Sequence, residues 1–218
     1  MIETNSFTIA RLNKKFKIYS NKKIDCYKLE SDNQKRFLIN GIDVNINGKL
    51  EKILIVGVHL PSKIIGEREQ NIKAAQLLSY ISQTVENLKE KIKTEKVIFV
   101  GDFNLDPYES PLNDGTGLKT TNCPYSPAKI SNYGVEQILY YNPSHHLLGN
   151  LDKNAYGTYF HQYNWSAIDQ VIISKELYSF FLSSKFEVLL LENNKLLKNN
   201  RPNKSLSDHL PIKFEFNI

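Results

Sequence analysis

The sequence predicts an α+β fold, in which one long helix packs against a face of a β-sheet. Three observations lead to this prediction. Short segments rich in β-branched and aromatic residues recur along the chain. One segment between two of them repeats apolar residues at helical spacing. With 41% hydrophobic and 23% charged side chains, the 218 residues suit one domain, residues 1–218, with a sizeable core.

The strands are expected where β-branched and aromatic residues gather. These segments are Phe37 to Asn47, Ile53 to His59, Lys96 to Asp102, Ala167 to Ser174, Phe186 to Leu191 and Ile212 to Phe216. Between the second and third, Glu67 to Lys93 is expected to be an amphipathic helix. Its apolar residues repeat at intervals of three or four, at Leu77, Ile81, Val85, Leu88 and Ile92. The strand, helix, strand order places that helix against one face of the sheet.

A second, shorter helix is expected to begin after Ser174, which can cap it, and to run through Leu182. Its apolar residues Leu177, Phe180 and Phe181 are expected to face inward. From Leu105 to Asn154, Pro, Asn, Ser, Gly and Tyr are frequent, which predicts long surface loops with one short strand near Val135 to Tyr141. Such loops either shape a substrate cleft or simply connect other elements.

The charge balance favours an anionic partner, because the formal net charge is +5. Basic residues concentrate in Arg11 to Lys28 and in Asn193 to Ser207. The first cluster is typical of a solvated face. In the second, Arg201 and Lys204 lead toward a candidate site, so this loop is either solvated or holds the flanking phosphates of a polyanion.

Cysteine usage and hydropathy bear on the compartment. Cys26 and Cys123 show no spacing typical of a metal clip or redox pair, which favours a reducing compartment. No apolar run has the length of a membrane span, and the first sixteen residues do not resemble a secretory signal. A cytoplasmic protein without a membrane span is therefore expected.

Two motifs far apart in the sequence carry candidate chemistry. Gly101-Asp102-Phe103-Asn104 ends an apolar strand segment, and Ser207-Asp208-His209-Leu210-Pro211 lies near the C-terminus. If the strand pleat continues, Asp102 and Asn104 point to the same side, where Asp102 can take a proton from water and Asn104 can hold that water. A carboxylate and amide at a strand end, with an Asp-His pair, indicate a metal-assisted phosphoester site.

Two further residues lie at the ends of expected strands. His59 ends one strand, although a lone histidine there is more often structural. Asp169 lies at the start of the apolar segment Ile168 to Ser174 and requires a partner such as an imidazole if it faces inward. In the segment that precedes it, Tyr163 and Trp165 are expected to pack in the core, with stacking on a base as the alternative.

Taken in order, these motifs resemble the endonuclease/exonuclease/phosphatase superfamily, which contains deoxyribonuclease I. The matching motifs are Val58-His59-Leu60, Gly101-Asp102-Phe103-Asn104, Gly157-Thr158-Tyr159, Ile168-Asp169-Gln170-Val171-Ile172 and Ser207-Asp208-His209-Leu210-Pro211. The resemblance implies a four-layer α/β/β/α sandwich of two mixed β-sheets, with the site at one rim. It also implies hydrolysis of a phosphoester with a divalent ion, Mg²⁺ or alternatively Mn²⁺.

The resemblance assigns expected roles to the site residues. Asp102 would orient or deprotonate the water, and Asn104 would contact that water or the phosphate. His209 would bind the scissile phosphate and be oriented by Asp169. His59 would serve the leaving-group side. The implied metal ligands are Asp102, Asn104 and Asp208, and the implied substrate contacts are Asn104, His209, Lys204 and Arg201.

The chain departs from the family pattern at its beginning. Family members begin with a strand that bears an Asn and a second strand that ends in Gln-Glu, whose glutamate holds the metal, so the fold is expected to be N-terminally incomplete. Three accounts remain open: missing upstream sequence, a partner chain that supplies the glutamate, or a non-catalytic relative. An apolar sheet edge would favour a partner or self-association. The function is therefore a metal-dependent phosphodiesterase, most plausibly a nuclease, or alternatively a phosphate- or nucleic-acid-binding module.

Overall fold

The structure, a computed structural model, describes residues 7–11, 17–20, 25–31, 36–46, 48–126, 128–132, 134–148, 157–190 and 195–217. Its centre is a mixed seven-stranded sheet in the order β3-β4-β5-β6-β13-β10-β7. The strands span β3 Asp25–Ser31, β4 Phe37–Ile46, β5 Lys49–His59, β6 Val97–Asp102, β7 Thr120–Thr121, β10 Tyr140–Tyr141 and β13 Asp169–Ile173. The chain is therefore α+β, as the sequence predicts.

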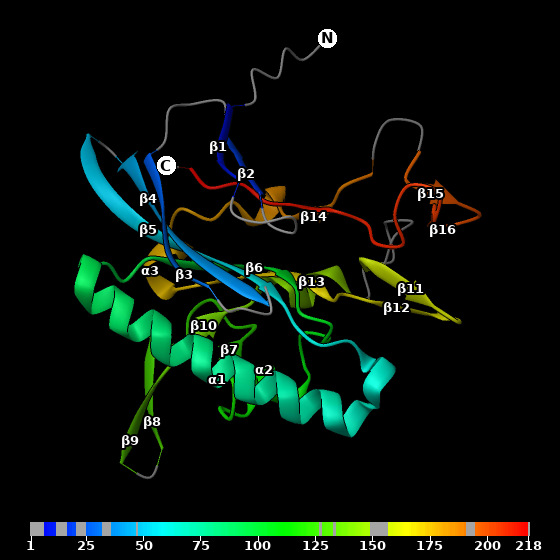
Figure 1. Ribbon diagram of the computed structural model, residues 1–218, viewed down its shortest axis with the longest axis horizontal. Coiled ribbons are helices and arrows are strands. Elements are labelled where there is room, and N and C mark those ends of the chain that lie inside the picture. Colours follow the sequence, from blue (N-terminus) through cyan, green and yellow to red (C-terminus); the bar gives the residue numbers. More distant parts are fainter. Residues whose placement is uncertain are drawn as a thin grey trace.

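The long helix α1, Glu67–Ile92, connects β5 to β6, which pair in parallel. In Figure 1 it crosses the lower face of the sheet. Its fully buried stripe is displaced from the predicted one and includes two polar residues. The buried positions are Gln70, Ala74, Leu78, Ile81, Val85 and Lys89, while Leu77, Leu88 and Ile92 pack against the core only partly buried.

Both faces of the central sheet are buried. Because successive side chains of a strand point to opposite sides, one strand contributes to two cores. On β6, Val97 and Phe99 belong to the core beneath α1, whereas Ile98 belongs to a second core on the opposite face. Strand pairs β1 (Phe7–Arg11) with β2 (Lys17–Ser20) and β14 (Glu187–Val188) with β17 (Ile212–Lys213) lie on the side away from α1 (Figure 1). In the described residues, these pairs stand where a second sheet is expected.

The remaining elements are short. The strand pairs are β8 Lys129–Asn132 with β9 Val135–Ile138, β11 Tyr159–His161 with β12 Asn164–Ser166, and β15 Leu197–Lys198 with β16 Arg201–Pro202. The helices are η1 Lys63–Ile65, α2 Ser110–Asn113, η2 Pro143–Leu147, α3 Lys175–Tyr178 and η3 Ser183–Lys185. Residues 105–148 thus hold more regular structure than the long loops that the sequence predicts.

The predicted second helix is shorter than expected, because α3 ends at Tyr178. Ser174 makes no side-chain cap; instead its Oγ accepts a hydrogen bond of 3.0 Å from the backbone N–H of Val97. The residue that was expected to cap a helix therefore joins the end of β13 to the start of β6. Leu177 and Phe181 are buried, as predicted, and Phe180 is half-buried.

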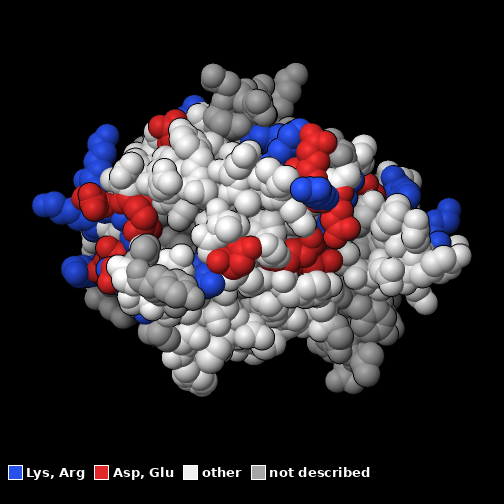
Figure 2. All heavy atoms as spheres, turned by 90° about the horizontal axis from the view of Figure 1, so that it is seen from below, with Lys and Arg blue, Asp and Glu red and all other residues white. Residues whose placement is uncertain are grey.

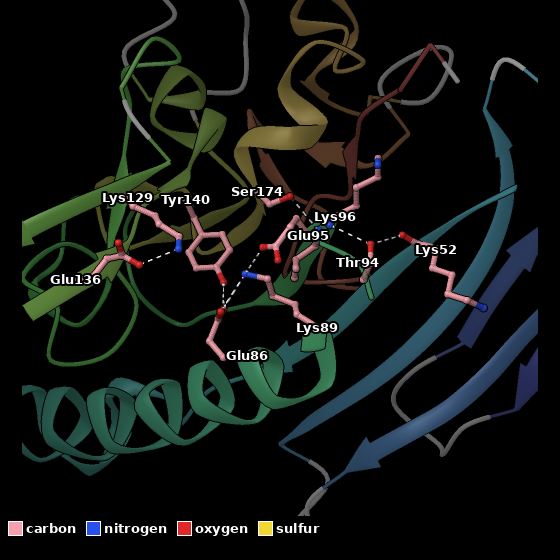
Figure 3. A network of polar contacts seen from close by, with 11 residues as sticks. Lys52, Glu86, Lys89, Thr94, Glu95, Lys96, Lys129, Glu136, Tyr140 and Ser174 are labelled. Atoms are coloured by element: carbon pink, nitrogen blue, oxygen red, sulfur yellow. Dashed lines mark hydrogen bonds and ion pairs between the residues drawn. The ribbon is translucent and has the colours of Figure 1, made fainter. Parts of the chain in front are cut away.

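An ion-pair cluster around the buried side chain of Lys89 fastens the C-terminal end of α1 to the sheet (Figure 3). The side chain of Lys89, only 6% exposed, reaches Glu86 at 2.9 Å and Glu95 at 2.7 Å. The hydroxyl of Tyr140 donates to the same Glu86 at 3.1 Å. Burial of Lys89 acts to lower its pKa, but the two glutamates outweigh burial and raise the pKa above its ordinary value. The cluster therefore ties α1, β10 and the residues before β6 together.

Lys89→Ala is expected to destabilise the protein by about 2 kcal/mol, because two glutamates lose their common cation. Lys91→Ala is the matched control, since Lys91 is exposed on the same helical turn and its loss should change stability by less than about 0.5 kcal/mol. Urea unfolding of both variants measures the difference. Equal stability of the two variants would contradict a structural role for the cluster.

Candidate active site

Three of the predicted site residues lie in one row across neighbouring strands. His59 is the last residue of β5 and pairs in register with Asp102, the last residue of β6. Asp102 in turn pairs with Asp169, the first residue of β13. Because directly opposed residues of adjacent strands share a face of the sheet, the register brings these side chains together. The Nε2 of His59 lies 3.7 Å from Oδ2 of Asp102.

Gly101 permits β5 and β6 to approach closely at this end of the sheet. Its φ is +143°, and a Cβ atom there would lie only 2.1 Å from the carbonyl oxygen of Val58. A side chain is therefore excluded at the residue before Asp102, which gives a physical reason for glycine at this point of the motif.

Asn104 reaches Asp102 through a turn and not through a continued pleat. The strand ends at Asp102, and Asn104 has a left-handed φ of 51°. Its backbone N–H donates to Oδ1 of Asp102 at 2.9 Å, and its Nδ2 donates to Oδ2 of Asp102 at 3.0 Å and to the carbonyl of Leu60 at 3.1 Å. Both amide hydrogens of Asn104 are thus engaged, which leaves its Oδ1 to contact a ligand.

The Asp102 carboxyl is partly enclosed and next to another carboxylate. Burial, together with the negative charge of Asp169, raises the pKa of Asp102 to about 6, although hydrogen bonds from Asn104 act in the opposite direction. A carboxyl with a pKa near neutrality can exchange a proton with water under ordinary conditions.

His209 joins the row from the C-terminal part of the chain. Its Nδ1 lies 2.8 Å from Oδ2 of Asp169, and this hydrogen bond raises the pKa of His209 above its usual value, although burial acts against it. Leu210 donates its backbone N–H to the carbonyl of Thr158 at 2.6 Å, which fixes this segment beside β11. With Nδ1 held by Asp169, Nε2 is the ring nitrogen that remains for a ligand.

The residues present fit a divalent cation. Ligand atoms of Asp102, Asp169 and His209 all lie within 4.8 Å of one another. Carboxylate and amide oxygens suit a hard cation such as Mg²⁺. Burial and the negative charge of Asp169 raise the pKa of Asp102, and a nearby cation would offset both by favouring the ionised carboxylate.

The other predicted site residues lie outside this row. Asp208 is exposed and is not in the group of three, although its charge contributes to the raised pKa of His209. Arg201 and Lys204 are exposed, and the guanidinium carbon of Arg201 lies 4.7 Å from the ring centroid of Phe160. In the first basic cluster, Lys14, Lys15, Lys22 and Lys23 lie outside the described residues.

Gln70 is a site-supporting residue that the sequence interpretation missed. It is fully buried on α1, and its Nε2 donates to the carbonyl of Asn104 at 2.8 Å and to that of Pro61 at 3.2 Å. It therefore holds together the two loops that follow β5 and β6. The available signal was a polar residue on the apolar stripe of the helix, four positions before Ala74 and eight before Leu78.

Gln70→Leu is expected to lower stability by about 2 kcal/mol, because two loop carbonyls lose their donor while the side-chain size is kept. Gln76→Leu serves as the control, since Gln76 is exposed on the same helix. Urea unfolding reports stability, and calorimetric titration with Mg²⁺ should show weaker binding for the Gln70 variant only. If both variants bind Mg²⁺ as the wild type does, Gln70 does not support the site.

Thr158 is a second missed residue. Its Oγ1 accepts a hydrogen bond of 3.0 Å from the backbone N–H of Asp169, and it is fully buried. It fixes the backbone at the point where β13 begins. The Gly157-Thr158-Tyr159 motif identified the segment but gave no role for its hydroxyl.

The mixed sheet, the long covering helix α1 and the Asp-Asp-His group at the sheet rim define a protein with the deoxyribonuclease I-like fold. Residues 8–211 match the model of the endonuclease/exonuclease/phosphatase family. The chain therefore belongs to this family. A comparison with curated proteins gives no significant match.

Among solved structures, the chain is similar to the catalytic domain of APE2 from Xenopus laevis, with 16% identity, a TM-score of 0.52 and coverage of 84% of this chain and 55% of that one. It is also similar to truncated TDP2 from Caenorhabditis elegans, with 17% identity, a TM-score of 0.45 and coverage of 89% and 65%. The catalytic domain of human nocturnin with bound sulfate is similar as well, with 17% identity and a TM-score of 0.44. This match covers 89% of this chain and 58% of that one. The chain thus spans between 55% and 65% of these three structures, and the APE2 likeness supports the fold.

Proposed function

We propose that this chain is a divalent-metal-dependent phosphoester hydrolase, specifically a phosphodiesterase that acts on nucleic acid. The observation that carries the proposal is the His59, Asp102, Asp169 row with His209 hydrogen-bonded to Asp169 at its end. Acids and imidazoles in contact at a sheet rim can move protons and stabilise negative charge. Membership of the family supports the same reaction class.

In the proposed mechanism, Asp102 orients the attacking water and accepts its proton. As an ionised carboxylate, which a nearby cation favours, Asp102 can accept that proton. Asn104 contacts the water or the phosphate, and the free atom for this contact is Oδ1. His59, 3.7 Å from Asp102, acts on the leaving-group side.

His209 binds the scissile phosphate through Nε2. Asp169 holds Nδ1 of the ring and favours its protonated form, so that the imidazolium can stabilise charge that develops on the phosphate. Thr158 keeps the backbone of Asp169 in place through its hydroxyl.

Mg²⁺, or alternatively Mn²⁺, would be held by Asp102 and Oδ1 of Asn104, with Asp208 beside it. When bound, such a cation neutralises charge on the phosphate and acidifies water. The 4.8 Å grouping also includes Asp169 and His209. We assign His209 to the phosphate and Asp169 to holding its ring, since their mutual hydrogen bond leaves Nε2 of His209 for an anion.

A nucleic acid is favoured over other phosphoesters because of charge beside the site. Residues 195–207 hold Lys195, Lys198, Arg201 and Lys204 and no acid. Of these, Lys204 and Arg201 are proposed to contact phosphates that flank the scissile one. In Figure 2, the far right-hand end of the molecule, where Figure 1 places β15 and β16, carries Lys and Arg without Asp or Glu.

Hydrolysis of supercoiled plasmid and of single-stranded RNA tests the proposal. The 218-residue chain is compared in Mg²⁺ and in EDTA, beside Asp102→Ala, with circular dichroism to show that each protein is folded. Cleavage that requires Mg²⁺ and is lost in the variant supports the proposal. Absence of cleavage by the folded chain on either polymer would contradict nuclease activity.

The second candidate is a phosphate- or nucleic-acid-binding module without catalysis. The four basic residues of 195–207 favour it. It predicts oligonucleotide binding that weakens steeply with salt and is unchanged by Asp102→Ala.

A partner chain, or a second copy of this chain, is proposed at the edge of the central sheet. Strand β3 is an edge strand of that sheet in the described residues, and edge strands present unpaired backbone groups. Light scattering of the eluting protein should then give a mass above that of one chain. A mass of 25.1 kDa would exclude self-association.

A further inference from the structure

Three aromatic rings follow one another on the side of the β11–β12 hairpin that faces the site. The His209 ring centroid lies 5.0 Å from that of Tyr159. Beyond it, the Tyr159 and His161 centroids are 6.3 Å apart, and their planes differ by only 7°. We call His209, Tyr159 and His161 the ring row. It leads from the proposed phosphate-binding histidine toward the tip of the hairpin.

Strand geometry explains the ring row. Tyr159 and His161 are two positions apart on β11 and therefore share a face, and Tyr159 is bridged to His209 on the adjoining segment. The opposite face of the hairpin carries Phe160 and Trp165, whose rings contact each other at 5.2 Å. Trp165 packs against the second core. The hairpin is thus anchored by one face and presents rings on the other.

The ring row is accessible to a ligand. His161 is exposed and Tyr159 is half-buried. At the hairpin turn, Tyr163 is 89% exposed, which corrects the expectation that it packs in the core.

The hairpin beside the ring row is basic, whereas the His209 end of the row contacts the carboxylate of Asp169 and follows Asp208. Hairpin residues 157–166 and the adjacent residues 195–207 together contain four Lys or Arg and no Asp or Glu. Arg201 lies on the Phe160 ring, so the two hairpins contact each other. Arg201 therefore contacts the Phe160 face of β11, opposite the ring row, so the stacking inference rests on the rings themselves.

We infer that the ring row is a stacking surface for unpaired bases next to the scissile phosphate, and that the substrate class is single-stranded nucleic acid. The inference rests on the proposed function, because His209 must hold the phosphate for the neighbouring bases to reach the ring row. An unpaired base offers its flat face to an aromatic ring, whereas a base inside a duplex is covered by its neighbours. Each base beside the phosphate can then lie on Tyr159 or His161.

Fluorescence anisotropy in EDTA tests the inference without hydrolysis. The probes are a labelled single-stranded oligonucleotide, an abasic strand of the same length and a duplex. His161→Ala is expected to weaken binding of the base-bearing strand by about 5- to 100-fold and to leave the abasic strand and the duplex unchanged. His161→Phe should restore binding, because it keeps a ring without the imidazole charge. His146→Ala is the matched control, since His146 is an exposed histidine on η2.

Three results would overturn the inference: no loss in His161→Ala, an equal loss on the abasic strand, or no rescue by His161→Phe. The last two would mean that His161 acts through charge or local structure. Because the assay measures binding, its outcome is separate from hydrolysis. A chain that shows the base-dependent loss but cleaves nothing keeps the stacking surface and loses the proposed activity.

Discussion

His209→Ala should reduce the rate of the proposed hydrolysis by about 10³-fold, because it removes the group that is proposed to stabilise charge on the phosphate. The fold should survive, since the His209 side chain is half-buried at the sheet rim and not in either core. Initial rates on plasmid or RNA in Mg²⁺ measure the effect. His146→Ala, a change of the same kind on η2, should retain the wild-type rate.

Asp169→Asn probes the same pair from the other side. It keeps the size of the side chain but removes the negative charge that favours imidazolium, so we expect a loss of about 10²-fold. If the two residues act as a unit, the double variant should be no slower than His209→Ala alone. Losses that multiply would show that Asp169 has a separate role, such as metal binding.

Gly101→Ala should lower the free energy of unfolding by more than about 4 kcal/mol, or prevent folding altogether. The added Cβ would meet the Val58 carbonyl oxygen at 2.1 Å, and that atom belongs to the backbone of a central strand. Relief of the contact requires β5 and β6 to separate where His59 and Asp102 lie. Activity should therefore fall together with stability.

The control for this substitution is Gly48→Ala. Gly48 also has a positive φ, +82°, but nothing lies within 4 Å of a Cβ there. Only the backbone strain remains, with an expected cost of about 1 kcal/mol. Urea unfolding of both variants separates strain from the steric contact. Similar midpoints for the two would mean that the sheet absorbs the contact.

The elements that the sequence predicts well are those with a long, regular pattern. The helix expected over Glu67 to Lys93 is α1, and the strands expected at Ile53 to His59 and Lys96 to Asp102 are β5 and β6. Apolar periodicity specifies such buried elements directly. The exact stripe was less well predicted, because Gln70 and Lys89 are buried only with hydrogen-bond and ion-pair partners from distant parts of the chain.

The elements that the sequence predicts poorly depend on tertiary contacts. Strands β1, β2 and β3 were missed, since they are short and mix polar with apolar side chains without a regular alternation. The helix after Ser174 was predicted too long, because the Ser174 hydroxyl bonds to Val97 and Phe181 instead bridges to Phe216. Local propensity does not contain these long-range pairings.

The candidate site likewise combines residues that the motifs predict with contacts that depend on tertiary structure. The motifs identified His59, Asp102, Asn104, Asp169 and His209, and the structure brings all five close to Asp102 or Asp169. The left-handed turn at Asn104 and the amide support from Gln70 were not predicted, since each depends on which backbone carbonyls lie nearby.

The row from His59 through Asp102 and Asp169 to His209 also bears on how the proposed activity depends on folding. Its members are separated by tens of residues and meet only through strand pairing and the final C-terminal segment. Formation of the site therefore carries the loop-closure entropy of the sheet, because non-local pairings must form before its members meet. Residual activity should disappear over the same range of denaturant concentration as the sheet unfolds. Loss of catalysis would then report the cooperative unfolding of the whole domain.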